Sequence, residues 1–341
     1  MESVICSMSS TATKERGQTS ADIHVGGQAV IEGVMIRSPH KICTAVRKPD
    51  GEIVVKNQKF ISLTQRYKLL RLPLIRGFVS FVEMLVISIK TLNYSAEIAI
   101  KEEEKKNPKK EKAGSDFLRS LYLILTVIFA MALGVGIFVF LPLWFSDIVG
   151  VRKEALAFNL IAGILRVILF VSYVWAISRI SEFKKIFQYH GAEHKSIYTF
   201  EAGKELTVEN VKDFSTRHPR CGTSFILIVV VFAILFYSVS DTIYYLAVGV
   251  PPALVKRFLL HFSLLPLVAG VGYELLRLSG KTQNLKIIRF LSTPGLWIQS
   301  ITTNEPTEDQ MEVALVALKN ALSQKDLSLA ADKETANQPP G

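Results

Sequence analysis

Four apolar stretches interrupt an otherwise polar chain. Ser120 to Phe145 contains 26 residues without a charge, whereas a helix needs about 20 residues to cross the hydrocarbon core of a bilayer. Ala155 to Ser178 is a second stretch, interrupted only by Arg166. Thr223 to Ser240 and Phe258 to Tyr273 are the third and the fourth. The pattern predicts an all-α polytopic membrane protein with four transmembrane helices.

The distribution of basic residues orients this predicted bundle. Residues 1 to 119 contain 20 Lys and Arg, the loop 179 to 222 contains 8, and the tail from 277 contains 7. The two remaining loops contain two each. Because positive residues favour the cytoplasmic side, we expect a plasma-membrane protein with both termini and the central loop in the cytoplasm. Residues 146 to 154 and 249 to 257 are then extracytoplasmic.

The region before the first apolar stretch divides into four parts. Residues 1–22 are polar and predicted to be disordered, and residues 23–68 form a cytoplasmic Gly-rich segment with a β-hairpin. The hairpin is predicted from two alternating runs, 41 to 48 and 52 to 60, that flank Pro49-Asp50-Gly51. We interpret the glycines at 26, 27 and 33 as turn or bulge positions.

A predicted amphipathic helix and a charged linker lead into the bundle. Over residues 69–100, Arg76, Glu83, Lys90 and Glu97 recur every seven residues and form one polar stripe on an apolar cylinder. We expect this helix to lie on or in the inner leaflet. Residues 101–119 are interpreted as a solvated linker that touches lipid head groups.

The remainder of the chain comprises the membrane region and a cytoplasmic end. Residues 120–278 hold the four helices and the loop 179–222, and residues 279–323 form a cytoplasmic segment with a helix. Thr293-Pro294-Gly295 is expected to break the chain, and Thr307 with Gln310 predicts a capping box for the last helix. Residues 324–341 are predicted to be disordered.

Composition narrows the classes of partner. The mean hydropathy of +0.30 and 49% hydrophobic residues favour a membrane protein, and three widely separated cysteines imply no disulfide framework. The net charge of +10 accumulates next to the apolar stretches, where it is typical of contact with anionic lipid. We therefore expect the bilayer and its anionic head groups as partners, together with an unidentified protein partner or substrate, and no nucleic acid.

His190-Gly191-Ala192-Glu193-His194 carries the clearest candidate chemistry. On a helix, residues i and i+4 share a face, so His190 and His194 are placed to bind one Zn²⁺, while Glu193 is placed to take a proton from metal-bound water. The alternative is a head-group-facing helix end with ordinary histidines. Gly191 argues for this alternative, because glycine weakens a helix where the ligands must be aligned.

A second polar cluster closes the same loop, from Arg217 to Ser224. His218 and Cys221 are candidates to complete a metal shell. Alternatively, Cys221 is a small residue beneath a helix N-terminus. Arg217, Arg220 and Lys195 are then candidates to hold a lipid phosphate at that positive helix end.

Two further charged residues lie at or within the predicted helices. Glu274 sits at the inner end of the fourth helix and is a candidate third metal ligand or a partner of Arg277. Arg166 lies in the middle of the second helix, where we expect a structural role with Glu83 or Asp241 as its partner.

Four motifs together resemble the bacterial YqhQ-like family. They are Gly-Gly-Gln-Ala-Val-Ile-Glu-Gly-Val-Met-Ile-Arg at 26 to 37, His-Gly-Ala-Glu-His-Lys at 190 to 195, His-Pro-Arg-Cys-Gly-Thr-Ser at 218 to 224, and Tyr-Glu-Leu-Leu-Arg at 273 to 277. The resemblance covers roughly residues 24 to 322, and it implies a predicted metal-dependent membrane enzyme. The family's candidate site residues carry over to His190, Glu193, His194, His218 and Cys221.

The sequence thus favours metal-assisted hydrolysis at the cytoplasmic membrane face. In this hypothesis His190 and His194 bind Zn²⁺ with a third ligand from His218, Cys221 or Glu274, and the substrate is a peptide or a lipid-linked molecule. The alternative is a non-enzymatic membrane scaffold or lipid-binding protein, in which a structural metal joins the central loop to the helix ends.

Overall fold

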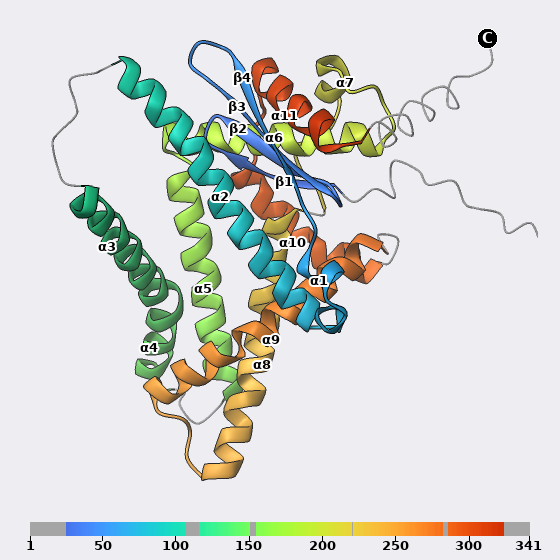
Figure 1. Ribbon diagram of the computed structural model, residues 1–341. Coiled ribbons are helices and arrows are strands. Elements are labelled where there is room, and N and C mark those ends of the chain that lie inside the picture. The colour runs from blue at the N-terminus through green and yellow to red at the C-terminus, as the bar shows by residue number, and fades with distance from the viewer. Residues whose placement is uncertain (1–24, 107–115, 151–154, 220, 282–285, 324–341) are drawn as a thin grey trace, which may run out of the picture.

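The structure is a computed structural model that describes residues 25–106, 116–150, 155–219, 221–281 and 286–323 (Figure 1). A small sheet and several helices stand at one end of a helical bundle. The elements, in chain order, are β1 Gly26–Val30, β2 Gly33–Arg37, β3 Lys41–Arg47, β4 Ile53–Lys59, α1 Leu63–Arg66, η2 Lys68–Arg71, α2 Ile75–Lys106, α3 Asp116–Val135, η4 Gly136–Phe140, α4 Leu141–Ile148, α5 Ala155–Ile177, α6 Ser181–Glu201, α7 Val208–Lys212, α8 Gly222–Val248, α9 Leu254–Lys281, α10 Lys286–Thr302 and α11 Glu308–Ala321. The predicted disordered ends and residues 107–115 of the predicted linker lie outside the described residues, and the rest of that linker belongs to α2 and α3.

The four strands form one antiparallel meander in the order β1-β2-β3-β4. The predicted hairpin is confirmed as β3 and β4, and Gly51 in its turn has a φ of +92°, which a side chain would strain. The interpretation of Gly26, Gly27 and Gly33 as turn or bulge positions is wrong, because all three lie in regularly paired strands. The glycine-rich run forms strands β1 and β2, and the turn between them is at Glu32, with a φ of 52°.

The two faces of the sheet bury different helices. Val34 and Ile36 of β2 belong to a core shared with α6 and α11, whereas Met35 belongs to a core shared with α2. This alternation follows from the two-residue period of a strand. The sheet therefore separates the long helix α2 from α6, and β1 contacts both helices.

Helix α2 begins later than the sequence predicted. Residues 63–71 form the short helices α1 and η2, and Leu74 has a positive φ of 69° directly before α2. Pro73 accounts for the break, since the residue before a proline is driven out of helical geometry. The start of α2 then packs on α9. A Cβ on Gly77 would lie 2.6 Å from the carbonyl oxygen of Gly270, so only glycine permits this crossing.

Three helical segments are long and apolar enough to cross a membrane. They are Ile128–Ile148 in α3, η4 and α4, Ala155–Ile177 in α5, and Leu254–Glu274 in α9. A shorter apolar segment, Phe232–Val248, lies in α8. The protein is therefore mostly helical, with three candidate membrane spans and one small antiparallel sheet.

The C-terminal segment differs from the sequence prediction at one point. The prediction that Thr293-Pro294-Gly295 breaks the chain is wrong, because α10 runs through it from Lys286 to Thr302. Packing of α10 against α8 and α5 outweighs the local preference of these residues. The predicted capping box is confirmed, with Thr307 and Gln310 exchanging hydrogen bonds at the start of α11.

Candidate metal centre

Helix α6 places His190 and His194 on one face, one turn apart. Their ring centroids lie 4.4 Å from each other. Gly191 between them does not interrupt the helix, and its role is steric. A Cβ there would lie 2.1 Å from the carbonyl oxygen of Asn304, whose N–H donates to Phe187 at 2.9 Å. Glycine therefore lets the segment after α10 cross directly over the helix beside the histidines.

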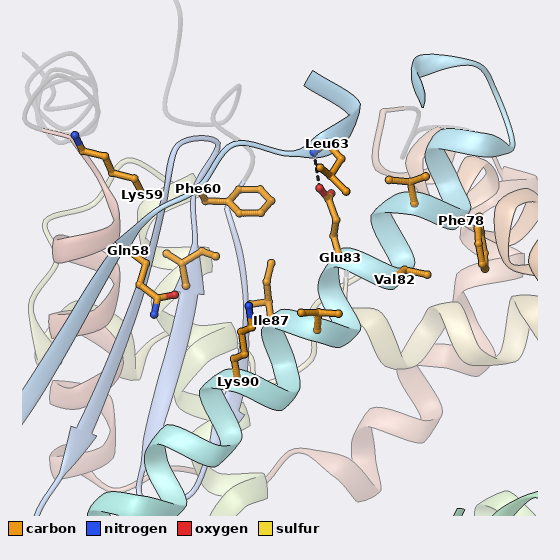
Figure 2. A pocket seen from close by; sticks show the side chains of 12 residues that line it. Gln58, Lys59, Phe60, Leu63, Phe78, Val82, Glu83, Ile87 and Lys90 are labelled. Atoms are coloured by element: carbon orange, nitrogen blue, oxygen red, sulfur yellow. Dashed lines mark hydrogen bonds between the residues drawn. The ribbon is translucent and has the colours of Figure 1, made fainter. Parts of the chain in front are cut away.

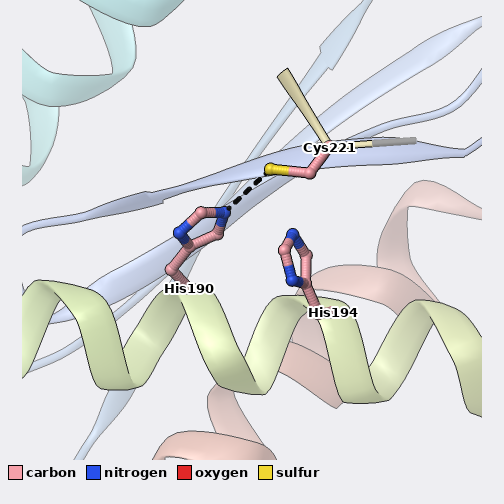
Figure 3. A group of neighbouring side chains, drawn as sticks. All are labelled: His190, His194 and Cys221. Atoms are coloured by element: carbon pink, nitrogen blue, oxygen red, sulfur yellow. Dashed lines mark hydrogen bonds between the residues drawn. The ribbon is translucent and has the colours of Figure 1, made fainter. Parts of the chain in front are cut away.

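Cys221 meets the two histidines from another element. It occupies the N-cap of α8, and its Sγ lies 3.3 Å from Nε2 of His190 (Figure 3). The ligand atoms of His190, His194 and Cys221, which we call the metal cluster, all lie within 4.8 Å of one another. Tetrahedral zinc would hold a nitrogen and a sulfur about 3.6 Å apart, as follows from bond lengths of about 2.05 and 2.3 Å. The donor set and its spacing therefore fit zinc.

Backbone carbonyls hold both imidazoles in the orientation that metal binding requires. Nδ1 of His190 lies 2.9 Å from the carbonyl oxygen of Thr302, and Nδ1 of His194 lies 2.5 Å from that of Thr216. A carbonyl only accepts, so each Nδ1 carries the proton and donates it. In the neutral form of each ring, Nε2 then carries the lone pair that a metal would accept, as in most protein zinc sites.

Burial keeps the surrounding histidines neutral. Desolvation lowers the pKa of His194, although hydrogen bonding to Cys221 opposes that shift. Desolvation also lowers the pKa of His218, to about 4, against the attraction of Glu193. Both rings are therefore uncharged at neutral pH, and a metal ion does not need to displace a proton from His194.

Glu193 lies beside the metal cluster and is almost fully buried, with 4% of its surface exposed. Its Oε2 is 3.9 Å from Nε2 of His190. Burial raises the pKa of Glu193, while His190, His218 and a hydrogen bond from the backbone N–H of Gly27 lower it. A Cβ on Gly27 would lie only 3.0 Å from Cγ of Glu193, so strand β1 covers this carboxylate directly.

His218 is close to the metal cluster but forms different contacts. Its backbone N–H donates to Oε1 of Gln299 at 2.7 Å, and Nε2 of Gln299 donates back to its carbonyl oxygen at 2.8 Å. Its Nε2 lies 3.4 Å from Oε2 of Glu201. Of the two candidates in the loop, Cys221 and not His218 joins the two histidines of α6.

Glu274 lies in a separate ion pair. It accepts two hydrogen bonds from the guanidinium of Arg76 at the start of α2, one of them from Nε at 2.5 Å. Sequence reasoning expected metal or Arg277 as its partner, and the side chain of Arg277 lies outside the described part of the structure. The contact with Arg76 joins α2 to α9, and only the tertiary structure reveals it.

The candidate phosphate ligands do not form one site in the described residues. Nζ of Lys195 is 2.8 Å from Oε2 of Glu305 and donates to the carbonyl oxygen of Lys212 at 3.2 Å. Arg217 is exposed, and Arg220 lies outside the described residues. Lys195 is therefore committed to protein partners.

Comparison with known proteins places the chain in a family. The family described as "Protein of unknown function (DUF1385)" matches residues 72–324. The chain belongs to this family. A relative from Bacillus subtilis (strain 168), "Uncharacterized protein YqhQ", is 33% identical over 324 residues, which cover 92% of this chain and 96% of the relative. No solved structure matches the chain.

Within this family member, sequence reasoning missed a second buried polar group. Asp241 of α8 accepts from Asn159 of α5 at 2.8 Å, and Arg257 and His261 of α9 lie 2.9 and 3.0 Å from its carboxylate. We call these four residues the aspartate cluster. Sequence reasoning placed Arg257 in the loop 249 to 257 and considered Asp241 only as a partner of Arg166, so it did not bring these residues together.

Arg166 has neither of its expected partners. Its Nε donates to the carbonyl oxygen of Phe138 at 3.3 Å, and its guanidinium lies 5.9 Å from the ring centroid of Tyr237. Glu83 accepts instead from Ser62, and Asp241 belongs to the aspartate cluster. The carbonyl comes from η4, a π-helical turn, whose irregular backbone leaves a carbonyl free for the arginine.

Proposed function

We propose that this protein is a zinc-dependent hydrolase whose site lies at the cytoplasmic face of the plasma membrane. The observation that carries the proposal is the convergence of the unprotonated Nε2 atoms of His190 and His194 with Sγ of Cys221. Three protein ligands with a fourth position left for substrate or water are the pattern of catalytic zinc sites. Zinc held there supplies Lewis acidity to water and to a polarised carbonyl or phosphoryl group.

Residues around the metal cluster have distinct parts in this proposal. Glu193 lies beside the ligands without belonging to the cluster, so it serves as the general base that accepts a proton from water. The N–H of Gly27 fixes the orientation of that carboxylate. The substrate is a peptide or a lipid-linked molecule, because the site adjoins helices apolar enough to cross a membrane.

Variants of Glu193 and the histidines test the proposal. His190→Ala and His194→Ala should each remove stoichiometric zinc from the purified protein. Glu193→Gln should retain zinc but abolish function in a complementation assay, because an amide of the same shape cannot accept the proton. Glu193→Asp is a companion variant, because it keeps a carboxylate that can act as a base but moves it away from the metal ligands by one methylene. Full complementation by Glu193→Gln would rule out the hydrolase.

One observation favours a second candidate, a membrane scaffold with a structural metal. The ligands come from α6 and α8, and α10 orients one of them through the carbonyl of Thr302. A metal there would join three helices, and its binding free energy would be folding free energy. In that case the histidine variants lower the melting temperature, whereas Glu193→Gln is nearly silent in the complementation assay.

The membrane placement extends the three candidate spans to four. We infer that α8 is the remaining span, because Phe232–Val248 is apolar and α8 is 27 residues long. Four spans put both termini on one side, and the basic residues make that side cytoplasmic. Single cysteines within 146–154 or 249–253 should then be labelled from outside intact cells. Equal labelling of a cysteine at 205 would contradict both the orientation and the cytoplasmic site.

A further inference from the structure

One turn of helix α10 contacts both segments that carry the proposed metal ligands. The carbonyl oxygen of Thr302 orients the ring of His190 on α6. Gln299 lies three residues earlier on the same side of α10, and its side chain reaches the segment before α8. Helix α10 thus contacts a histidine of the metal cluster and also the segment that leads to its cysteine.

Gln299 forms two hydrogen bonds with the backbone of a single residue, His218. The Gln299 side chain is 0% exposed. Its Oε1 accepts from the N–H of His218 at 2.7 Å, and its Nε2 donates to the carbonyl oxygen of His218 at 2.8 Å. A carboxamide supplies an acceptor and a donor side by side, so it satisfies both backbone groups at once. The backbone of His218 is therefore fixed relative to α10.

His218 begins the turn that ends at Cys221. The N–H of Cys221 donates to the carbonyl oxygen of His218 at 3.2 Å, and Pro219 occupies the second position of this turn, where proline is favoured. Cys221 then starts α8 with an extended backbone, and its side chain does not cap the helix. Its Sγ lies 3.3 Å from Nε2 of His190 (Figure 3). A displacement of His218 would therefore displace the thiol.

A purely structural role and a positioning role for Gln299 predict different consequences. A buried carboxamide that is removed lowers stability wherever it lies, because its partners lose their hydrogen bonds. A residue that positions a metal ligand also lowers the affinity for the metal, typically by about 10–100-fold. The two roles are therefore separated by comparing buried glutamines near the metal cluster and away from it.

We propose that Gln299 is the positioning residue that places Cys221 against His190 and His194 by holding the backbone of His218. The proposal rests on the proposed zinc site, but not on hydrolysis, because it concerns how the third ligand is held. Without the carboxamide, the two histidines keep their places on a continuous helix. The thiol of Cys221 does not.

Gln299→Met tests the proposal in the full-length protein, because it removes the carboxamide and keeps an unbranched side chain of similar size. The variant should bind zinc about 10–100-fold more weakly than the wild type. X-ray absorption at the zinc edge should show the nitrogen contribution retained and the sulfur contribution reduced. Wild-type affinity with the full sulfur contribution would overturn the proposal and leave the hydrolase proposal standing.

Two further glutamine-to-methionine variants are matched controls. Gln310→Met removes another buried carboxamide, which bonds to Thr307 and Gln188, so it should lower the melting temperature without changing the zinc affinity. Gln58 lines the apolar pocket between α2 and the sheet, on the face opposite the metal cluster (Figure 2), and Gln58→Met should change neither quantity. An equal loss of zinc affinity in Gln299→Met and Gln310→Met would assign the effect to general stability and overturn the proposal.

A measurement on the metal-free protein separates this proposal from the proposed function. Alkylation of Cys221 by iodoacetamide, followed from the mass of its peptide, should be several-fold faster in Gln299→Met than in the wild type, because the turn is released. Where Gln299→Met does not fold, Gln299→Glu serves instead. An ionised carboxylate still accepts from the N–H of His218 but cannot donate to its carbonyl oxygen, so alkylation should again be faster. Equal rates in the wild type and the folded variant would contradict the proposal, whether or not the protein is a hydrolase.

Discussion

The metal cluster and the aspartate cluster both contain histidine, and both include a residue of α8, Cys221 at its N-cap and Asp241 farther along the helix. Cys221 and Asp241 are 20 residues apart on this helix, about 30 Å along its axis. In the aspartate cluster, a carboxylate that is 1% exposed meets Arg257, His261 and Asn159 within 3.0 Å. In the metal cluster, the ligand atoms of two histidines and one cysteine lie within 4.8 Å of one another.

The difference separates a charge-balanced polar cluster from one that calls for a ligand. Arg257 compensates the charge of Asp241 and also lies 3.6 Å from the ring centroid of Phe158. The ligand atoms of His190 and His194 instead lie within 4.8 Å of each other and of Sγ of Cys221. A cation bound by these ligand atoms stabilises the folded protein, because its binding free energy adds to the free energy of folding. Variants in the two clusters should therefore fail in different ways.

Removing Asp241 should give the largest loss of stability. Asp241→Ala leaves Arg257 as a buried charge without compensation, which typically costs about 3–5 kcal/mol. We expect poor folded yield and a strongly lowered melting temperature in detergent. Asp213→Asn, at an exposed carboxylate that pairs with Lys204, is the control and should be nearly silent. A wild-type melting temperature for Asp241→Ala would mean that the aspartate cluster is not structural.

Substituting one histidine in each cluster should lower the zinc affinity only for the variant in the metal cluster. His194→Ala removes a ligand atom, so the affinity for zinc should fall by more than the roughly 10–100-fold that loss of an outer partner costs. His261→Gln, at the other buried histidine, should leave the zinc affinity unchanged. The measurement is competition with a chromophoric chelator. Equal zinc affinities in the two variants would remove the distinction between the clusters.

Adding one methyl group at strand β1 should disturb Glu193 selectively. In Gly27→Ala the new Cβ would lie 2.5 Å from the carbonyl oxygen of Met35 and 3.0 Å from Cγ of Glu193, so we expect a destabilisation of about 1–3 kcal/mol. Gly26→Ala is a matched control, because nothing lies within 4 Å of its Cβ. Thermal unfolding of the two variants compares them directly. Identical curves would mean that β1 does not cover the carboxylate closely.

The smallest expected effect is a pH dependence from His218. Its pKa is about 4 in the folded protein, below the usual value of 6.5, because burial disfavours the charged ring. The unfolded chain therefore binds more protons between these values, and stability falls as the pH is lowered through them. The loss between pH 7 and pH 5.5 should be about 1 kcal/mol. His218→Gln should flatten this part of the stability profile; an unchanged slope would assign it to other groups.

Local patterns predicted what depends on neighbours in sequence. The capping box at Thr307, the hairpin turn at Gly51 and the shared face of His190 and His194 each need only a few consecutive residues, and each was predicted. Close approaches between segments that are distant in the sequence were not predicted. Gly191 was taken as a weakness of the helix, whereas its missing side chain admits the backbone of Asn304.

The sequence also did not determine which residue joins His190 and His194 as the third metal ligand. The sequence left the third position beside His190 and His194 open among His218, Cys221 and Glu274. Which of them converges depends on Arg76 and Gln299, residues of α2 and α10 that pair with Glu274 and His218. No spacing within the motifs encodes those pairings, because they arise from the packing of whole helices.

X-ray absorption at the zinc edge tests the metal cluster most directly. Full-length protein loaded with one equivalent of zinc should show one sulfur neighbour at about 2.3 Å and imidazole nitrogens at about 2.0–2.1 Å. Cys221→Ser should remove the sulfur contribution, and Glu193→Gln should leave the spectrum unchanged because Glu193 is outside the ligand set. A spectrum without sulfur, or a protein that takes up no zinc, would contradict the account.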